Sequence, residues 1–119
     1  MISRIWHGWT VRENADKFET LLRAHVLPGI DRTKGYMGAY LLRREAANDE
    51  VEFVTITQFM DIDAVKAFAG ADYERAVIAQ GAVGMLTHYD ERSAHYDTRI
   101  TPADVREAAA RQSGRNRIV

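Results

Sequence analysis

The chain contains no cysteine, which excludes disulfide bonds, thiolate nucleophiles and thiolate metal sites. Its 16 Lys and Arg residues nearly balance its 17 Asp and Glu residues, for a net charge of -1, so we expect no nucleic-acid or membrane-surface partner. No apolar run approaches the roughly 20 residues of a membrane span, and the first residues lack the long apolar segment of a signal peptide. These absences favour a cytoplasmic protein.

The 119 residues, of which 46% are hydrophobic, fit one compact domain with a single core. β-branched and aromatic residues predict a first strand over residues 2–11. Apolar residues at helical spacing predict a helix over residues 13–27, which Pro28 and Gly29 are expected to end. Two further strands are expected over residues 36–45 and 51–60, because the polar pair Asn48-Asp49 between them is typical of a hairpin turn.

The remaining elements are predicted from caps and turn residues. Asp61 is the expected N-cap of a helix that ends at Gly70, and Asp72 is the expected N-cap of a short helix over residues 73–80. Residues 92–100 read as a fourth strand. The resulting βαββαβ order predicts an α+β protein with the antiparallel sheet of ferredoxin-like folds.

Apolar residues occupy both faces of the expected third strand. One face holds Val51, Phe53 and Phe59, and the other holds Val54, Ile56 and Met60. Two helices cover only one face of a four-stranded sheet, whereas a face in water should alternate apolar with polar residues. We therefore expect a homodimer in which a second copy covers the other face.

The end of the chain lies outside this domain of residues 1–100. Thr101 as N-cap, Pro102 at the first helical position and Asp104 at the third predict a C-terminal helix. Its face is nearly all alanine, so it buries little area, and we expect it to lie across the partner protomer or to fray. Residues 113–119 are expected to be disordered.

Four stretches occur in order over residues 2–100: RIWHG, GYMGAYLLRR, FMDIDAVKAFAG followed at once by ADYERAV, and AHYD. In these stretches the chain resembles the antibiotic biosynthesis monooxygenase-type family of dimeric α+β-barrel proteins. The resemblance implies two ferredoxin-like protomers packed sheet to sheet, with a pocket in each protomer between its sheet and its helices. Some members oxidise aromatic polyketides with dioxygen and no cofactor, relatives cleave heme, and many have no assigned reaction.

The resemblance also implies which chemistry is absent. The heme-degrading relatives use an Asn on the first strand, a Trp at the end of the third and a His on the second helical segment. The matching positions here are Gly8, Phe59 and the histidine-free stretch 72–80. We therefore expect no heme and no other cofactor.

Three histidines are candidate catalytic bases, because a neutral imidazole accepts a proton from a quinol or enol before its oxidation by dioxygen. Side chains alternate between the two faces of a strand, so His7 is expected on the face away from Trp6 and Gly8. His95 lies on the expected fourth strand, which pairs with the first, so His7 and His95 are expected to be cross-strand neighbours. His25 lies on the apolar stripe of the first helix. The alternatives are a hydrogen-bonded interface pair for the two strand histidines and a core histidine for His25.

Six further residues are candidates for binding a substrate. They are Trp6, Tyr40, Thr55, Thr57, Phe59 and Tyr96. The two threonines interrupt an apolar row on the third strand and fit a partly polar cavity, and the phenols are candidates to orient a substrate carbonyl or hydroxyl. Core or interface packing of the aromatic residues and the strand preference of threonine are the alternatives. No His and carboxylate pair has the local spacing of a metal site.

Two functions remain open from the sequence. The first is a cofactor-independent monooxygenase acting on an aromatic or enolisable small molecule, with a histidine as base. The second is a non-catalytic homodimer of the same fold with a binding or structural role, so whether the chain is an enzyme stays undecided at this point.

Overall fold

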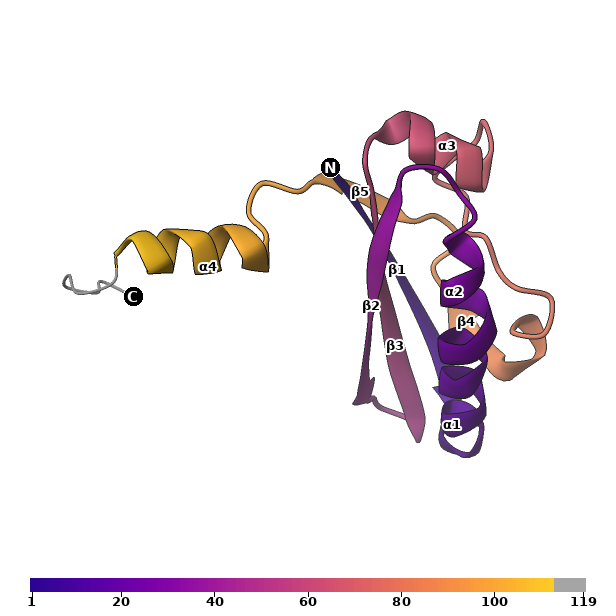
Figure 1. The fold of residues 1–119 in the computed structure, drawn as a ribbon. Helices are drawn as coiled ribbons and strands as arrows, with labels where there is room; N and C mark the ends of the chain where they lie inside the picture. Colours follow the sequence, from indigo (N-terminus) through magenta and orange to yellow (C-terminus); the bar gives the residue numbers. More distant parts are fainter. Residues whose placement is uncertain (113–119) are drawn as a thin grey trace.

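The computed structural model describes residues 1–112, and within them five strands form one antiparallel sheet (Figure 1). The elements in chain order are β1 (Ile2–Val11), α1 (Arg12–Leu21), the π-helical turn η1 (Leu22–Val26), α2 (Leu27–Ile30), β2 (Tyr36–Glu45), β3 (Glu50–Phe59), α3 (Ile62–Ala69), the 3-10 turn η2 (Val83–Met85), β4 (Leu86–Tyr89), β5 (Ala94–Asp97) and α4 (Pro102–Arg111). The strand order is β2-β3-β1-β4, and β5 also pairs with β1. This confirms the ferredoxin-like α+β fold.

Several local predictions are confirmed by the backbone. Asn48 and Asp49 both have φ of 60°, as a type I′ hairpin turn between β2 and β3 requires. Asp61 caps α3 by accepting a hydrogen bond from the Ala64 N–H at 2.9 Å. Thr101 and Asp104 form a reciprocal capping box at the start of α4.

The first helix does not end at Pro28 and Gly29, which is a correction to the sequence prediction. It continues through η1 and α2 to Ile30. Pro28 lacks the N–H that the interior of an α-helix uses. The π-helical turn before it, which ends with the Leu27 N–H donating to the Leu22 carbonyl, places Pro28 in the first turn of α2, where that N–H is not needed.

The predicted helix over residues 73–80 is also wrong. The Asp72 carboxylate pairs with Arg92 at 2.7 Å instead of capping a helix. The Ala76 N–H donates to the Glu91 carbonyl at 2.8 Å, so the backbone of this segment bonds to a distant part of the chain. The second helix of the ferredoxin-like unit is therefore α3 alone.

β5 lies within the predicted fourth strand of residues 92–100, and a further short strand, β4, precedes it along the same edge of β1. β5 pairs with residues Ile2 to Ile5 of β1, and β4 pairs with residues Gly8 to Thr10. β4 was not predicted from the sequence, because its four residues Leu86–Tyr89 are too few to show the alternation of a strand.

The long helix that runs through α1, η1 and α2 lies on one face of the sheet together with α3 and the core, and we call this face the inner face (Figure 1). Phe18 of α1 packs edge-on against Phe53 of β3 with ring centres 4.9 Å apart. A second cluster gathers around Phe59 and Val65, which are both fully buried. Burial of these rings supplies most of the apolar area that fixes the helices against the sheet.

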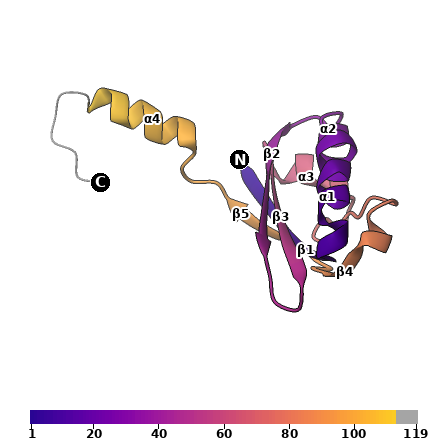
Figure 2. The same ribbon diagram turned by 90° about the horizontal axis from the view of Figure 1, so that it is seen from below.

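The opposite face, which we call the outer face, has no helix of the compact body over it (Figure 2). Register places Tyr40, Ile56 and Ile5 in one row across β2, β3 and β1 on this face. Leu42 and Val54 form the next row, and the side chain of Leu42 is 49% exposed. The outer face therefore carries an apolar patch open to the surroundings.

α4 extends from the end of β5 away from the compact body, on the side of the outer face (Figures 1 and 2). None of its residues is buried, and Val105 is 58% exposed. The predicted disorder of residues 113–119 concerns residues outside the described ones. Among the described residues, no helix is long and apolar enough to cross a membrane.

Candidate functional site

A cavity lies between the inner face of the sheet and the helices. Its floor is formed by Arg4 and Trp6 of β1 with Thr55 and Thr57 of β3, and Phe18 is among the residues of its wall. Residues 77–82, which cross over it between α3 and β4 without regular structure, contribute Val77 and other small apolar side chains as a cover. The cavity volume of about 60 Å³ is below the roughly 300 Å³ at which ligand pockets begin, so a ring-sized ligand requires the cover to move.

Strand alternation explains which β1 residues reach the cavity. Ile2, Arg4, Trp6 and Thr10 are buried on the inner face with Gly8, and the alternate residues, such as Ile5 and His7, lie on the outer face. Trp6 is anchored because its Nε1 donates to the Asp90 carbonyl at 2.9 Å. The indole also lies over the backbone of Gly8, where a Cβ would be 2.3 Å from its Cη2 atom. The glycine therefore makes room for the tryptophan.

Arg4 is the single titratable residue that lines this cavity among the described residues. Its side chain is almost fully buried, at 4% exposure, and its Cζ lies 5.7 Å from the centre of the Phe68 ring. Nη1 donates to the Tyr73 carbonyl and Nη2 donates to the Arg75 carbonyl at 2.9 Å. Burial lowers the pKa of Arg4 from its ordinary value. A cation is thus held in an apolar site by neutral acceptors.

Two hydroxyl groups lie at the same end of the cavity as Arg4. The Thr57 hydroxyl donates to the Arg4 carbonyl at 3.4 Å. Ser93 is 5% exposed, and its hydroxyl has no hydrogen-bond partner among the described residues. A buried polar group without a partner costs free energy, so it marks a place where a ligand or water is expected to bind.

His95 lies behind Arg4 and does not line the cavity. Its Nε2 is 3.0 Å from Arg4 Nη1 and accepts that hydrogen bond, which leaves Nδ1 buried and without a partner in residues 1–112. Burial lowers the pKa of His95, the positive charge of Arg4 lowers it further, and Glu74 acts in the opposite direction. His95 is therefore a neutral support for Arg4.

This arrangement predicts how stability changes with pH. The unfolded chain protonates His95 near pH 6.5, whereas the folded chain does so only at lower pH, so the free energy of unfolding falls as pH falls through that interval. The variant His95→Gln keeps an acceptor for Arg4 but does not titrate. We expect urea unfolding midpoints at pH 7.5 and 5.5 to differ less in His95→Gln than in the wild type. His25→Gln, on the exposed surface, is the control, and an unchanged difference in His95→Gln would contradict the prediction.

His7 is not a neighbour of His95, contrary to the sequence prediction. Register pairs His95 with Arg4, so His95 faces inward, and His7 points to the outer face. The His7 Nδ1 atom is 2.8 Å from a carboxylate oxygen of Asp90, and its ring is stacked 6.2 Å from that of Trp9. His7 therefore belongs to the outer face and not to the cavity.

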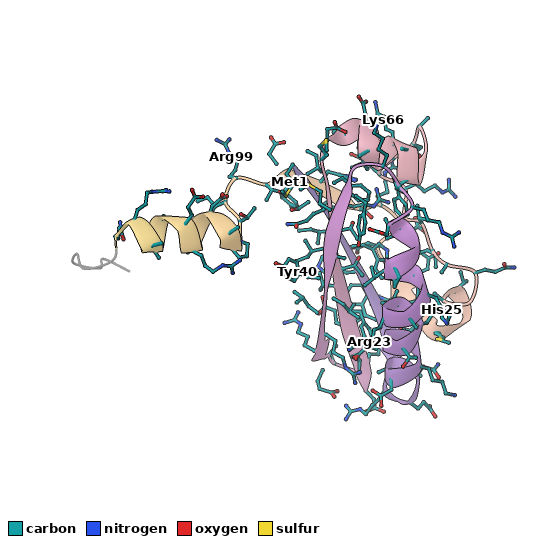
Figure 3. All side chains as sticks on the ribbon, in the orientation of Figure 1. Met1, Arg23, His25, Tyr40, Lys66 and Arg99 are labelled. Carbon is teal, nitrogen blue, oxygen red and sulfur yellow. The ribbon has the colours of Figure 1, made fainter. Side chains whose placement is uncertain are left out.

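His25 is exposed and does not face the sheet, which corrects the helical-stripe argument. The π-helical turn changes the angular positions of the residues after Leu22, so the stripe read at 3.6 residues per turn does not hold there. Figure 3 shows His25 on the outside of the helix, and it borders a shallow groove that Val77 and Ala79 also line. It is within reach of the cover but outside the main cavity.

The aromatic candidates divide between the two faces. Tyr40 and Tyr96 lie on the outer face, are 49% and 57% exposed, and do not reach the cavity; Figure 3 shows Tyr40 on the side away from the helices. Phe59 is fully buried in the core beside Tyr36 and Phe68, outside the cavity lining. Of the six predicted binding residues, the structure brings together Trp6, Thr55 and Thr57.

Sequence reasoning missed Arg4 and Ser93. A signal for Arg4 was present, because it stands between Ile2 and Trp6 at an inward position of a strand whose other inward residues are apolar, glycine or threonine. No comparable signal marks Ser93, whose burial depends on contacts between segments far apart in the sequence. Within residues 1–112 no group of acidic, histidine or cysteine side chains is arranged to hold a metal ion.

Comparison with known proteins places this geometry in a known fold. MhuD, a heme-degrader of Mycobacterium tuberculosis with two hemes bound in its active site, matches with a TM-score of 0.60 at 14% identity, over 85% of this chain and 98% of that one. SnoaB, a cofactor-independent oxygenase of Streptomyces nogalater, matches with a TM-score of 0.55 at 22% identity, over 85% and 96%. A Streptomyces coelicolor monooxygenase in complex with nanaomycin D matches with a TM-score of 0.58 at 14% identity, over 84% and 88%. The chain has the fold of antibiotic biosynthesis monooxygenase-type proteins.

The resemblance predicted from sequence is thus confirmed at the level of the fold. No family model matches the chain, and a search of curated proteins finds no match. Because one monooxygenase-type fold occurs in a heme-degrader and in cofactor-independent oxygenases, the chemistry of this chain has to be argued from its own cavity.

Proposed function

We propose that the chain is a cofactor-independent monooxygenase that oxidises an aromatic or enolisable small molecule with dioxygen. The observation that carries the proposal is the cavity between sheet and helices, which has aromatic and aliphatic walls and one polar end at Arg4 and Thr57. Apolar walls of this kind favour a flat organic molecule and keep water away from a reactive intermediate. Trp6, Thr55 and Thr57 are the proposed binding residues.

The proposed reaction converts an activated CH₂ group of the substrate, as in an anthrone, into a carbonyl. The substrate loses a proton to water and becomes an enolate, whose electrons reduce dioxygen to a peroxide anion bonded to the same carbon. This anion takes a proton back from water and becomes a hydroperoxide. Loss of water then breaks the O–O bond. The substrate gives up four electrons and dioxygen accepts four, with one oxygen atom retained in the product and the other released as water.

A second candidate is a protein of the same fold that binds a small molecule without turning it over. The observation in its favour is the absence of a histidine or carboxylate from the lining of this cavity in the described part of the chain. The two candidates share the ligand site and differ only in whether dioxygen is consumed.

We further propose that the chain forms a homodimer through the outer face. The exposed row of Tyr40 and its neighbours supports this, since contiguous apolar surface on a sheet is stabilised by a partner. A second copy also offers α4 a surface to pack on.

Dioxygen uptake with an anthrone or a hydroquinone tests the enzymatic proposal. We expect consumption above the uncatalysed rate, with one dioxygen per anthrone. Val77→Trp at the cover of the cavity should lower kcat/KM by about tenfold or more, because a bulky side chain obstructs the site. Val83→Trp is the matched control, since Val83 is 52% exposed and does not line the cavity. Ligand binding without any dioxygen uptake would favour the non-catalytic candidate.

A further inference from the structure

We propose that the polar end of the cavity is an anion-binding subsite, formed by Arg4 and Ser93, that takes the aromatic ligand as its oxyanion. A phenolate, an enolate or an aromatic carboxylate has the required chemistry. This inference rests on the proposed function, because it assumes that the cavity binds a small molecule.

The charge of Arg4 has no counter-ion in the described part of the chain. No carboxylate oxygen is within ion-pair distance of its guanidinium, and its acceptors are two backbone carbonyls and the neutral ring of His95. The nearby acidic residue Glu74 pairs with Arg92 instead, at 3.2 Å. A buried cation without an anion is unfavourable, and an anionic ligand oxygen would relieve this cost.

Arg4 and Ser93 both line the cavity, and both keep donors that no described residue accepts from. Nη1 of Arg4 donates to the Tyr73 carbonyl and to His95, and Nη2 donates once, to the Arg75 carbonyl. One N–H of Nη2 and the N–H of Nε are therefore left without an acceptor among the described residues. The Ser93 hydroxyl is buried, has no partner in residues 1–112, and lines the same cavity. A charged guanidinium and a buried hydroxyl, each with donors that lack an acceptor, are an arrangement that stabilises an oxyanion.

The other residues that line the cavity favour an aromatic anion over an inorganic one. Apart from the hydroxyls of Thr55 and Thr57, the rest of the lining is apolar, so a strongly hydrated inorganic anion would lose more hydrogen bonds to water than the cavity replaces. A ligand with an aromatic ring and one anionic oxygen can place its ring against the apolar walls and its oxygen at the polar end of the cavity. The same interaction lowers the pKa of a bound phenol or enol, so the oxidisable anion forms without a histidine in the site.

The test compares 4-nitrophenol with nitrobenzene, which has the same ring and nitro group but no acidic oxygen. Titration of the wild-type protein should show 4-nitrophenolate bound at least about tenfold more tightly than nitrobenzene, and the absorbance of the phenolate should show a lowered apparent pKa for the bound phenol. Ser93→Ala should reduce phenolate affinity about tenfold and leave nitrobenzene affinity unchanged. This variant breaks no hydrogen bond of the folded chain, so it is expected to fold.

Thr10→Val is the matched control, because the Thr10 hydroxyl is also buried without a partner but does not line the cavity. Its binding of both ligands should equal that of the wild type. Arg4→Gln should abolish the preference for the phenolate, and circular dichroism checks that it is folded. Equal wild-type affinity for the two ligands, or a preference that Ser93→Ala does not reduce, overturns the anion subsite but not ligand binding in the cavity. Absence of binding by either ligand overturns both.

Discussion

Replacing Ile56 by aspartate should convert a dimer into a monomer. Ile56 lies at the centre of the apolar patch on the outer face, between Tyr40 of β2 and Ile5 of β1. In a symmetric dimer each copy of the variant would bury an unpaired carboxylate, at a cost of several kcal/mol, on the order of a thousandfold or more in the dissociation constant. Sedimentation equilibrium at micromolar concentration should return twice the chain mass of 13.5 kDa for the wild type and the single mass for Ile56→Asp.

Val83→Asp is the control for this experiment. It introduces the same charge at an exposed apolar residue that lies outside the patch, so it should remain dimeric. Because Ile56 is only half-buried within one protomer, the monomeric variant should keep its circular dichroism spectrum. A wild-type protein that is a stable monomer at micromolar concentration would contradict the proposed dimer.

The parts of the fold that sequence predicted well depend on local chemistry. The period of two along residues 2–11 put Trp6 on one face of the strand and His7 on the other, and the structure has the same alternation. The turn at Asn48 and Asp49 and the cap at Asp61 depend on the conformational preferences of the residues themselves, so they hold regardless of the distant surroundings.

The errors arose where distant segments compete with local preference. Asp72 is a good N-cap by type, but its carboxylate binds Arg92, twenty residues away, and the predicted helix does not form. His25 was assigned to the inward stripe because a regular helix was assumed, and the single π-helical turn before Pro28 moved it outward. Neither the ion pair between Asp72 and Arg92 nor the π-helical turn can be recognised from a pattern in a single sequence.

The candidate site was predicted only in part, because some of its residues are brought together by segments far apart in the sequence. Strand alternation placed Thr55 and Thr57 on one face of β3, and Trp6 was a candidate on β1; all three line the cavity. The histidines were paired by strand order alone, but the register of β1 with β5 places Arg4 opposite His95 and leaves His7 beside Asp90. Register depends on the path of the chain before β5, where the sequence predicted a helix over residues 73–80 that does not form.

The last prediction concerns the glycine beneath the cavity tryptophan. Gly8→Ala should destabilise the folded chain by about 1–3 kcal/mol, because the added methyl would be 2.3 Å from the Trp6 ring and would force the ring to shift. Displacing Trp6 would also disturb its hydrogen bond to Asp90 and the floor of the cavity. Urea denaturation measures the loss.

Gly29→Ala is a matched change with the opposite expected sign. Gly29 lies in α2 with no atom within 4 Å of an added Cβ, so alanine should stabilise the chain by about 0.5–1 kcal/mol through its helix propensity. A double-mutant cycle then identifies the cause of the loss at Gly8. If the Trp6 ring is the obstacle, Gly8→Ala should cost markedly less in a Trp6→Leu background, because leucine leaves space over the backbone. The same cost in both backgrounds would show that the conformation of the β1 backbone, and not the packing of Trp6, requires glycine at this position.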